Sequence, residues 1–379
     1  MVQELSFWLA LLTLAPAAWL CPARWRPALL AAASALVLAP VAPLTVALLA
    51  AGVWVGAATL PRWPRAGAVA AVALLGGGLL AAKAALAAGA LGPALPLGLS
   101  FFCFRLVHYV VEARRGALPA HRPIEAVAWV LWFPIFTAGP IWRFGPEALG
   151  APGRPPTAAL VAAAWRLAWG LVKRFALAEL LVGGGAKDRG PAALIDTLEV
   201  LEPHQAWLWV GGSFLRLYLD FSGYSDIAIG ASGLFGVTVG ENFRWPMFAR
   251  SPADFWRRWH ISLSAWCQAY LYLPLLGLSR SPTLATFVTF ALIGLWHGVS
   301  GPFLLWGLAH GAAVAGTAAA TVALRRRKVA LPPALGLLGP PLTLAWAVAA
   351  HGLSLAHGVG DTGDALRIFA LLFGLRIAG

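Results

Sequence analysis

Charged residues are scarce in this chain of 379 residues. They make up only 11% of it, against 60% hydrophobic residues, and the mean hydropathy is +0.76. So little polar surface cannot cover a water-soluble protein of this size, which excludes a soluble enzyme. Because apolar stretches recur from Leu5 to Leu372, the composition indicates one polytopic membrane domain rather than several soluble domains.

Cysteine is also scarce. The three cysteines, Cys21, Cys103 and Cys267, are far apart and odd in number, which argues against a disulfide framework and against a metal site. The sequence also lacks the short motifs of nucleotide-binding loops, serine hydrolases and zinc proteases. We therefore expect no metal and no permanently bound cofactor.

Acidic residues are outnumbered by basic ones, 15 to 28, which gives a net charge of +13. The cations stand singly or in short runs between apolar spans, which indicates cytoplasmic loops beside anionic membrane lipids and not a nucleic-acid site. The densest run, Arg325 to Lys328, predicts a cytoplasmic end for the span before it and places the Ser300-Gly301 break outside. Arg24 and Arg26 follow the first apolar run, so we expect the N-terminus to lie outside.

The apolar stretches predict an all-α fold with about ten or eleven transmembrane or re-entrant helices. Prolines such as Pro134 and Pro140 interrupt several stretches, and irregular backbone at membrane depth needs surrounding protein or a water-filled cavity. No acidic residue lies between Glu4 and Glu112, so this region is interpreted as scaffold. Polar residues concentrate between 204 and 310, where we expect the chemistry.

His297 is the first candidate for that chemistry, in the run Gly294-Leu295-Trp296-His297-Gly298. An ionisable residue in an apolar helix is a functional candidate by default, although it can also be a packing residue bonded to a neighbouring helix. A group that titrates near pH 7 is suited to take a proton from an attacking hydroxyl. We expect Gly294 and Gly298 to let a substrate approach the ring. His310, 13 residues later, either orients His297 or bonds a backbone carbonyl.

Residues 251 to 266 form a second polar region. Ser251 to Asp254 has the form of a helix-capping box, and the following helix mixes Trp256, Trp259 and Trp266 with Arg257 and Arg258. This pattern is typical of a helix at the cytoplasmic membrane interface, with arginines facing headgroups or an anionic ligand. His260 ends its aromatic face and is either a structural residue at headgroup level or part of the site.

Asp220 and Asp226 flank a third polar region that includes Tyr224. Carboxylates inside a membrane need partners, and pairing with Arg216 or the arginines of residues 244 to 258 is favoured over a catalytic dyad. Gly223 between them predicts a discontinuous helix lining a cavity.

These motifs together resemble the membrane-bound O-acyltransferase (MBOAT) superfamily, most closely its bacterial alginate O-acetylation branch. The resemblance rests on Glu241-Asn242-Phe243, on Phe255-Trp256-Arg257-Arg258-Trp259-His260 and on Leu295-Trp296-His297-Gly298. Further matches extend it in the expected order over about residues 95 to 311, including Pro96 to Phe102, Gly170 to Arg174 and Tyr218 to Asp226. The resemblance therefore divides the chain into N-terminal scaffold helices at 1–94, a catalytic core at 95–311 and C-terminal helices at 312–379.

The resemblance implies a multi-pass enzyme of the bacterial inner membrane whose core forms a tunnel across the bilayer. An acyl thioester, acetyl coenzyme A or an acyl carrier protein, would supply an acyl group, expected to be acetyl, from the cytoplasm. A hydroxyl of a cell-envelope polysaccharide, or of a periplasmic partner protein, would receive it outside. His297 and His260 occupy the two characteristic histidine positions, with His297 as general base. The residues expected at the substrate are Trp296, Asn242, Arg257, Arg258, Trp259, Asp220, Asp226, Tyr224 and His310.

The sequence departs from the family pattern at Gln268-Ala269, where an Arg-Asp pair is usual, and after Asn242. Two other functions therefore stay open. A proton-coupled lipid or polysaccharide permease would use His297, Asp220 and Asp226 along its route. A degenerate member of the family would act only as a scaffold for envelope proteins.

Overall fold

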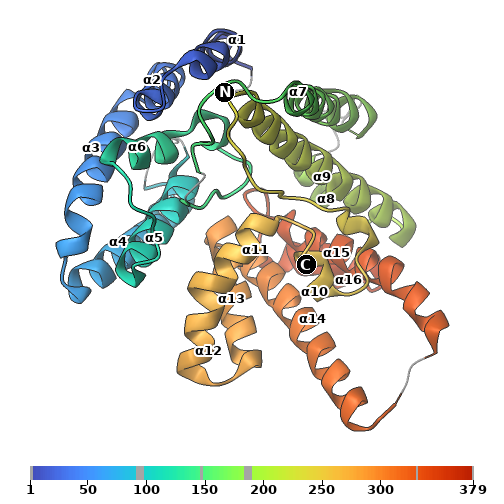
Figure 1. The fold of residues 1–379 in the computed structure, drawn as a ribbon. Helices are drawn as coiled ribbons and strands as arrows, with labels where there is room; N and C mark the ends of the chain where they lie inside the picture. The colour runs from blue at the N-terminus through green and yellow to red at the C-terminus, as the bar shows by residue number, and fades with distance from the viewer. Residues whose placement is uncertain (1–2, 91–97, 146–147, 183–189, 330–331, 378–379) are drawn as a thin grey trace. The chain divides into compact units, whose positions relative to one another are not determined.

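The computed structural model describes residues 3–90, 98–145, 148–182, 190–329 and 332–377. Every regular element in these ranges is helical, which confirms the predicted all-α class (Figure 1). The α-helices are α1 (Leu5–Leu20), α2 (Arg26–Leu38), α3 (Pro43–Thr59), α4 (Arg65–Ala87), α5 (Leu99–Arg115), α6 (Pro123–Leu131), α7 (Thr157–Leu171), α8 (Pro191–Asp196), α9 (Pro203–Leu234), α10 (Pro252–Trp256), α11 (Ile261–Cys267), α12 (Leu273–Ser279), α13 (Pro282–His297), α14 (Gly301–Arg326), α15 (Gly339–Ser354) and α16 (Thr362–Leu372).

Shorter helical turns connect several of these helices. Four are 3₁₀ turns, η1 (Leu60–Arg62), η2 (Phe133–Ile135), η4 (Pro246–Phe248) and η6 (Pro333–Leu338), and two are π-helical, η3 (Val172–Val182) and η5 (Gln268–Tyr272). Proline occupies the first turn of α2, α3, α6, α10, α13 and α14, where its missing N–H is not needed by the helix. Many of the prolines in this chain therefore begin helices.

Four helices in the described ranges are long and apolar enough to cross a membrane. They run over Arg65–Ala87, Ile261–Ser279, Gly301–Arg326 and Ala334–Ser354. Shorter apolar helices of 10–17 residues cover Leu5–Leu20, Arg26–Leu38, Pro43–Thr59 and Pro282–His297. The recurrence of apolar helices from the first to the last third of the chain agrees with a multi-pass membrane protein.

The chain divides into two compact units. Unit 1 comprises Met1–Ala82, Leu91–Arg174 and Phe221–Asn242, and unit 2 comprises Lys83–Ala90, Phe175–Asp220 and Phe243–Gly379. The long helices α4 and α9 each contribute one part to unit 1 and another to unit 2. Each unit is described separately below.

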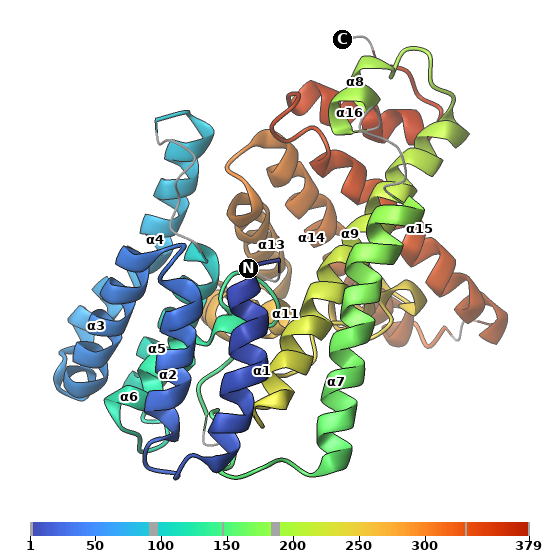
Figure 2. The same cartoon turned by 90° about the horizontal axis from the view of Figure 1, so that it is seen from above.

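In unit 1, α1 packs beside α2, as Figure 2 shows, and α6 packs against α2 and α3. After α6 the chain forms only the short turn η2 before it loses regular structure, yet Trp132, Phe133 and Ile135 are fully buried. The buried Arg105 donates hydrogen bonds to the carbonyl oxygens of Val130, at 2.9 Å, and Ile135. This irregular stretch is the one in which Pro134 and Pro140 predicted broken helices, and surrounding protein satisfies its backbone.

Gly223 does not break α9, so the predicted discontinuous helix at this position is wrong. The helix runs without interruption from Pro203 to Leu234. The glycine instead allows close packing, because a Cβ at Gly223 would lie 2.9 Å from the Gly170 carbonyl oxygen and the Arg174 backbone nitrogen. Small residues at such crossings let helix backbones approach each other within membranes.

In unit 2, α13 and α14 form an antiparallel pair joined by the turn at residues 298–300 (Figure 1). A Cβ at Gly294 would collide with the Phe303 carbonyl oxygen, and one at Gly307 would collide with the Phe290 carbonyl oxygen. These two glycines therefore permit the close approach of α13 and α14. α15 packs on α14, and α16 packs on α15.

Candidate active site

His297 is the last residue of α13 and lies among aromatic rings of unit 2. Its ring centroid is 4.5 Å from that of Trp296, 5.0 Å from that of Trp306 and 5.5 Å from that of Phe303, with which it stacks. Part of its surface nevertheless stays accessible. An imidazole with aromatic walls and one open side can exchange a proton with a substrate that reaches it.

His310 lies deeper, on the same side of α14 as Phe303 and Trp306. It is only 3% exposed, and its Nδ1 accepts a hydrogen bond of 3.2 Å from the Trp256 indole N–H. The Trp306 ring contacts both histidines, at 4.5 Å from His310 and 5.0 Å from His297. The hydrogen-bond partner of His310 is thus a tryptophan and not a backbone carbonyl, which was one of its two predicted roles, and Trp306 contacts the rings of both histidines.

The two glycines beside His297 have a different role from the predicted one of admitting a substrate. Gly294 accommodates the α14 backbone, and a Cβ at Gly298 would lie 2.7 Å from the Phe303 ring and 2.8 Å from the His357 ring. His357 follows α15 and is exposed, and its Nδ1 lies 3.0 Å from the Ser300 hydroxyl. A polar Ser300–His357 pair therefore stands at the turn that follows His297.

His260 caps the N-terminus of α11 and divides the segment that was predicted as one interfacial helix. It is 3% exposed and has φ 43° and ψ 54°, the left-handed region that a bulky residue rarely adopts. Strained backbone of this kind persists where packing holds it, often at functional sites. Unit 2 contains both predicted catalytic histidines, His260 and His297.

The predicted helix cap at the start of this segment is present. The Ser251 hydroxyl accepts a hydrogen bond of 3.1 Å from the Asp254 backbone N–H, and Pro252 is the first helical residue. Asp254 also receives bonds of 3.0 Å from the Arg250 backbone N–H and from the Arg258 guanidinium. Desolvation would raise the pKa of the Asp254 carboxyl, but these hydrogen bonds and the charges of Arg258 and Arg257 together lower it.

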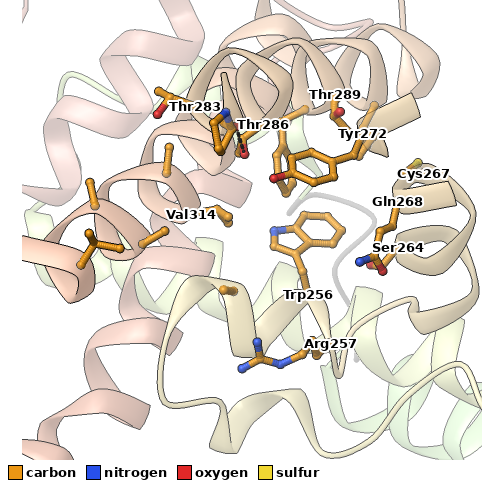
Figure 3. A pocket seen from close by; sticks show the side chains of 18 of the residues that line it. Trp256, Arg257, Ser264, Cys267, Gln268, Tyr272, Thr283, Thr286, Thr289 and Val314 are labelled. Carbon is orange, nitrogen blue, oxygen red and sulfur yellow. Dashed lines mark hydrogen bonds between the residues drawn. The ribbon is translucent and has the colours of Figure 1, made fainter. Parts of the chain in front are cut away.

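A cavity of about 850 Å³ opens beside these residues in unit 2 (Figure 3). Its walls are mostly apolar, and Trp256 projects into it with Arg257 beside it. The lining residues are Ala253, Trp256, Arg257, Ser264, Cys267, Gln268, Tyr272, Pro282, Thr283, Thr286, Thr289, Phe290, Ile293, Val314, Ala315, Ala318, Ala319, Val322, Ala323, Arg326 and Arg327. The π-helical turn η5 supplies Gln268 and Tyr272, and π-helical turns are frequent at functional sites.

His297 is not among the residues that line this cavity, but it lies on the face of α13 that does. Thr286, Thr289 and Ile293 line the cavity, and His297 follows Ile293 by four residues on the same face. Within the described ranges, the buried hydroxyls of Ser264 and Thr289 in this lining have no hydrogen-bond partner. Arg326 and Arg327 belong to the opposite, basic end of the cavity, since α14 runs antiparallel to α13.

Asp226 belongs to unit 1 and is held in an ion-pair network. Arg166 Nη2 lies 2.9 Å from its carboxylate, Lys173 forms a second ion pair with it, and Arg166 also pairs with Glu241. The predicted partners, Arg216 and the arginines of residues 244 to 258, were wrong for Asp226, because Arg216 pairs with Glu179. This arrangement favours the structural interpretation of Asp226.

The other residues expected at the substrate are distributed over both units. In unit 1, the Tyr224 hydroxyl lies 2.9 Å from the Thr137 hydroxyl, and the fully buried Asn242 donates to the Ser225 hydroxyl at 3.1 Å. In unit 2, Trp259 stacks on Phe214 and on Phe255, and Asp220 is half-buried on α9. Only Arg257 of the predicted arginine pair lines the cavity.

Several residues around His297 were missed by the sequence interpretation, namely Phe303, Trp306, Trp346 and His357. Phe303, Trp306 and His310 recur at intervals of three and four residues on α14, a helical face that the spacing could have indicated. Trp346, on α15, has its ring centroid 4.4 Å from that of His310, and no local sequence pattern indicated this contact. Among the described residues, no three His, Cys, Asp or Glu side chains are clustered as metal ligands would be.

A family model places this arrangement in a known group of proteins. The model of the membrane-bound O-acyltransferase family matches residues 97–355, more than half of the chain. The chain belongs to the membrane-bound O-acyltransferase family. The match includes His260, His297 and His310 and ends two residues before His357.

Curated relatives agree with the predicted branch of the family. A protein of Pseudomonas aeruginosa named "Probable alginate O-acetylase AlgI" is 39% identical over 226 residues, which cover 57% of this chain and 41% of the relative. The peptidoglycan O-acetyltransferase of Helicobacter pylori is 40% identical over 138 residues, 35% of this chain and 26% of that protein. The teichoic acid D-alanyltransferase of Streptococcus thermophilus is 28% identical over 236 residues, 57% of this chain and 55% of the relative.

The chain thus spans about half, or less, of the length of the curated relatives that it matches.

Proposed function

We propose that this membrane-bound O-acyltransferase family member transfers an acyl group from a cytoplasmic thioester to a hydroxyl on the outer side of the bacterial inner membrane. The observation that carries the proposal is the position of His297. It ends the face of α13 that lines the cavity, stands among aromatic rings and keeps an accessible surface. The family and the names of the relatives support acyl transfer as the reaction class.

In this mechanism His297 acts as the general base. It takes the proton of the acceptor hydroxyl as that oxygen attacks the thioester carbonyl carbon. A carbon–oxygen bond forms, and the carbonyl electron pair moves onto its oxygen. The intermediate then reforms the carbonyl, the carbon–sulfur bond breaks, and the thiolate leaves with the proton from the imidazolium. No permanently bound cofactor takes part, because the thioester is itself a co-substrate.

The basic end of the cavity suits the donor. Arg257, Arg326 and Arg327 line a cavity whose remaining walls are largely apolar, so their charges can bind phosphate while the walls receive an uncharged arm. Acetyl coenzyme A and acyl carrier proteins both carry a thioester on a phosphate-bearing arm. The run from Arg325 to Lys328 supports a cytoplasmic position for this end, because basic residues are enriched in cytoplasmic loops.

The acceptor reaches His297 from the outside in this proposal, through a tunnel shared by donor and acceptor. Ser300, in the turn after His297, and His357, which follows α15, offer polar contacts to a hydroxylated acceptor. The names of the relatives point to polymers of the cell envelope, namely alginate, peptidoglycan and teichoic acid. We infer the same acceptor class here, reached directly or through a periplasmic partner protein, with the N-terminus of the chain outside.

The test is transfer of labelled acetyl from acetyl coenzyme A or an acetylated carrier protein to envelope glycans. Membranes would carry the wild type, His297→Ala or the control His204→Ala, which removes an exposed histidine at the start of α9. We expect a loss of about 10³-fold per folded molecule for His297→Ala and an unchanged rate for the control. Equal rates in all three would refute the general-base role. Absence of transfer from any thioester, with proton-coupled transport in vesicles, would favour the permease.

A further inference from the structure

Lys83 is an unexplained cation in the most apolar part of the chain. Helix α4 is a candidate membrane span of 23 residues, and after its first residue, Arg65, its only charged side chain is Lys83. A cation inside a bilayer costs at least about 2.5 kcal/mol, so such residues normally have a partner or a function. Within the described ranges Lys83 forms no ion pair, and its contact is with a ring: Nζ lies 5.8 Å from the centroid of Trp296.

This ring belongs to the residue that precedes His297. Trp296 is thus flanked by two functional groups of unit 2, the Lys83 ammonium and the His297 imidazole, whose centroid is 4.5 Å away. The charge of Lys83 also reaches His297 through space. A cation over the face of tryptophan is attracted by the ring but is not neutralised, so it stays available to a negative charge.

Membrane topology independently places Lys83 and His297 toward the same side. Arg62 and Arg65 mark the N-terminal end of α4 as cytoplasmic, and Lys83 lies near its other end. The run from Arg325 to Lys328 likewise marks the cytoplasmic end of α14, opposite the turn that follows His297. Both side chains are therefore expected in the outer half of the bilayer.

Two backbone donors beside His297 are already engaged in hydrogen bonds. The Gly298 N–H is bonded to the Gly294 carbonyl oxygen at 3.1 Å, and the Ser300 N–H is bonded to the Gly298 carbonyl oxygen at 2.8 Å. The proposed reaction places a full negative charge on the former thioester carbonyl oxygen, next to His297. Groups aimed at such a developing charge are commonly the largest single contribution to catalysis.

We propose that the Lys83 ammonium is the catalytic cation that stabilises this oxyanion. The inference rests on the proposed acyl transfer and adds a residue outside the part of the chain that the family model matches. When the acceptor oxygen bonds to the carbonyl carbon, the carbonyl electron pair becomes the oxyanion that Lys83 faces. When the carbon–sulfur bond breaks, this pair reforms the carbonyl. Lys83 stays protonated throughout, and the moving proton passes from the acceptor to His297 and then to the leaving thiolate.

The experiment measures thiol release and acyl transfer by purified wild type, Lys83→Met, Lys83→Arg and the control Arg65→Met. Methionine keeps the length and apolar stem of lysine without its charge, and Arg65→Met removes a cation from the exposed first turn of the same helix. We expect Lys83→Met to lower kcat by about 10²-fold with little change in the KM of donor or acceptor. Lys83→Arg should recover part of kcat, and Arg65→Met should match the wild type.

Thiol release without an acceptor gives a second measurement, because water then attacks the same carbonyl and produces the same oxyanion. A Lys83→Met variant with wild-type kcat in both assays would overturn the inference while leaving acyl transfer intact. So would a raised KM at unchanged kcat, which would make Lys83 a binding group only. Absence of thiol release in the wild type with either donor would overturn the proposed function, and the inference with it. Equal heat stability of the variants in detergent shows that folding is not the cause.

Discussion

In unit 1 the buried carboxylate Asp226 lies between Arg166 and Lys173, whereas in unit 2 His297 lies among Trp296, Phe303 and Trp306. The first environment neutralises a charge with other charges. The second surrounds a titratable group with rings and leaves one side accessible. A carboxylate held in ion pairs stabilises the fold. An accessible imidazole among aromatic rings can instead bind and react with a substrate. The contrast separates a structural network from a candidate active site within one membrane protein.

The largest effect on stability is expected at Asp226. Asp226→Ala leaves Lys173 without its carboxylate and should lower the free energy of unfolding by about 3 kcal/mol. Heat stability of the detergent-purified protein would measure it. The double variant Asp226→Leu, Lys173→Met should recover part of the loss, because it removes both charges. Equal stability of Asp226→Ala and the wild type would contradict the structural role.

His310 should have a smaller effect of the same kind within unit 2. His310→Leu removes the acceptor for the Trp256 N–H, and a buried donor without a partner costs about 1–3 kcal/mol. His310→Gln, which retains an acceptor, should lose less. Thermal unfolding of both, together with Trp256→Phe in a double-mutant cycle, would measure the coupling. A cycle with no coupling would show that this hydrogen bond contributes nothing to stability.

Filling the cavity should affect turnover and leave stability almost unchanged. Ala315→Trp places a large ring in the lining, whereas Ala312→Trp places the same ring on an exposed position of α14. We expect the first to lower kcat/KM for the donor at least about tenfold and the second to leave it unchanged. Steady-state kinetics at varied donor concentration would measure this. Equal values for both variants would mean that the donor does not use this cavity.

The smallest expected effect is the pH dependence from Asp254. Because its pKa is lowered in the folded state, the carboxylate stabilises the fold above the ordinary aspartate pKa. That stabilisation is lost as the pH falls through the lowered value. Unfolding midpoints between pH 7 and pH 3 should therefore fall more steeply for the wild type than for Asp254→Asn. Parallel curves would show that Asp254 makes no such contribution.

Much of the fold could be predicted from local features of the sequence. Apolar runs gave the helices, and Ser251 with Pro252 gave the start of α10, because capping depends only on neighbouring residues. The predicted helix break at Gly223 was wrong because tertiary packing determines the role of this glycine. The glycine permits the close approach of Gly170 and Arg174 to α9, and the sequence of α9 alone does not contain that neighbour.

The candidate site was predictable only in part. His297 and His260 stood out as polar residues in apolar or aromatic surroundings, and unit 2 holds both of them. The contacts of Trp346, His357 and Lys83 with the site come from segments distant in sequence, namely α15, the turn that follows it and α4. Their side chains are also common as packing, loop or membrane-boundary residues. Only the packed structure distinguishes these three residues from such ordinary ones.

The most direct test of this contrast compares His297→Ala with Asp226→Asn in one preparation. Acyl transfer per folded molecule and the unfolding midpoint would be measured for both variants and the wild type. We predict that His297→Ala loses transfer by about 10³-fold at an unchanged midpoint. Asp226→Asn should unfold at a lower temperature and retain transfer in its folded fraction. Retained transfer in His297→Ala, or lost transfer in folded Asp226→Asn, would contradict the assignment of chemistry to His297 and of structure to Asp226.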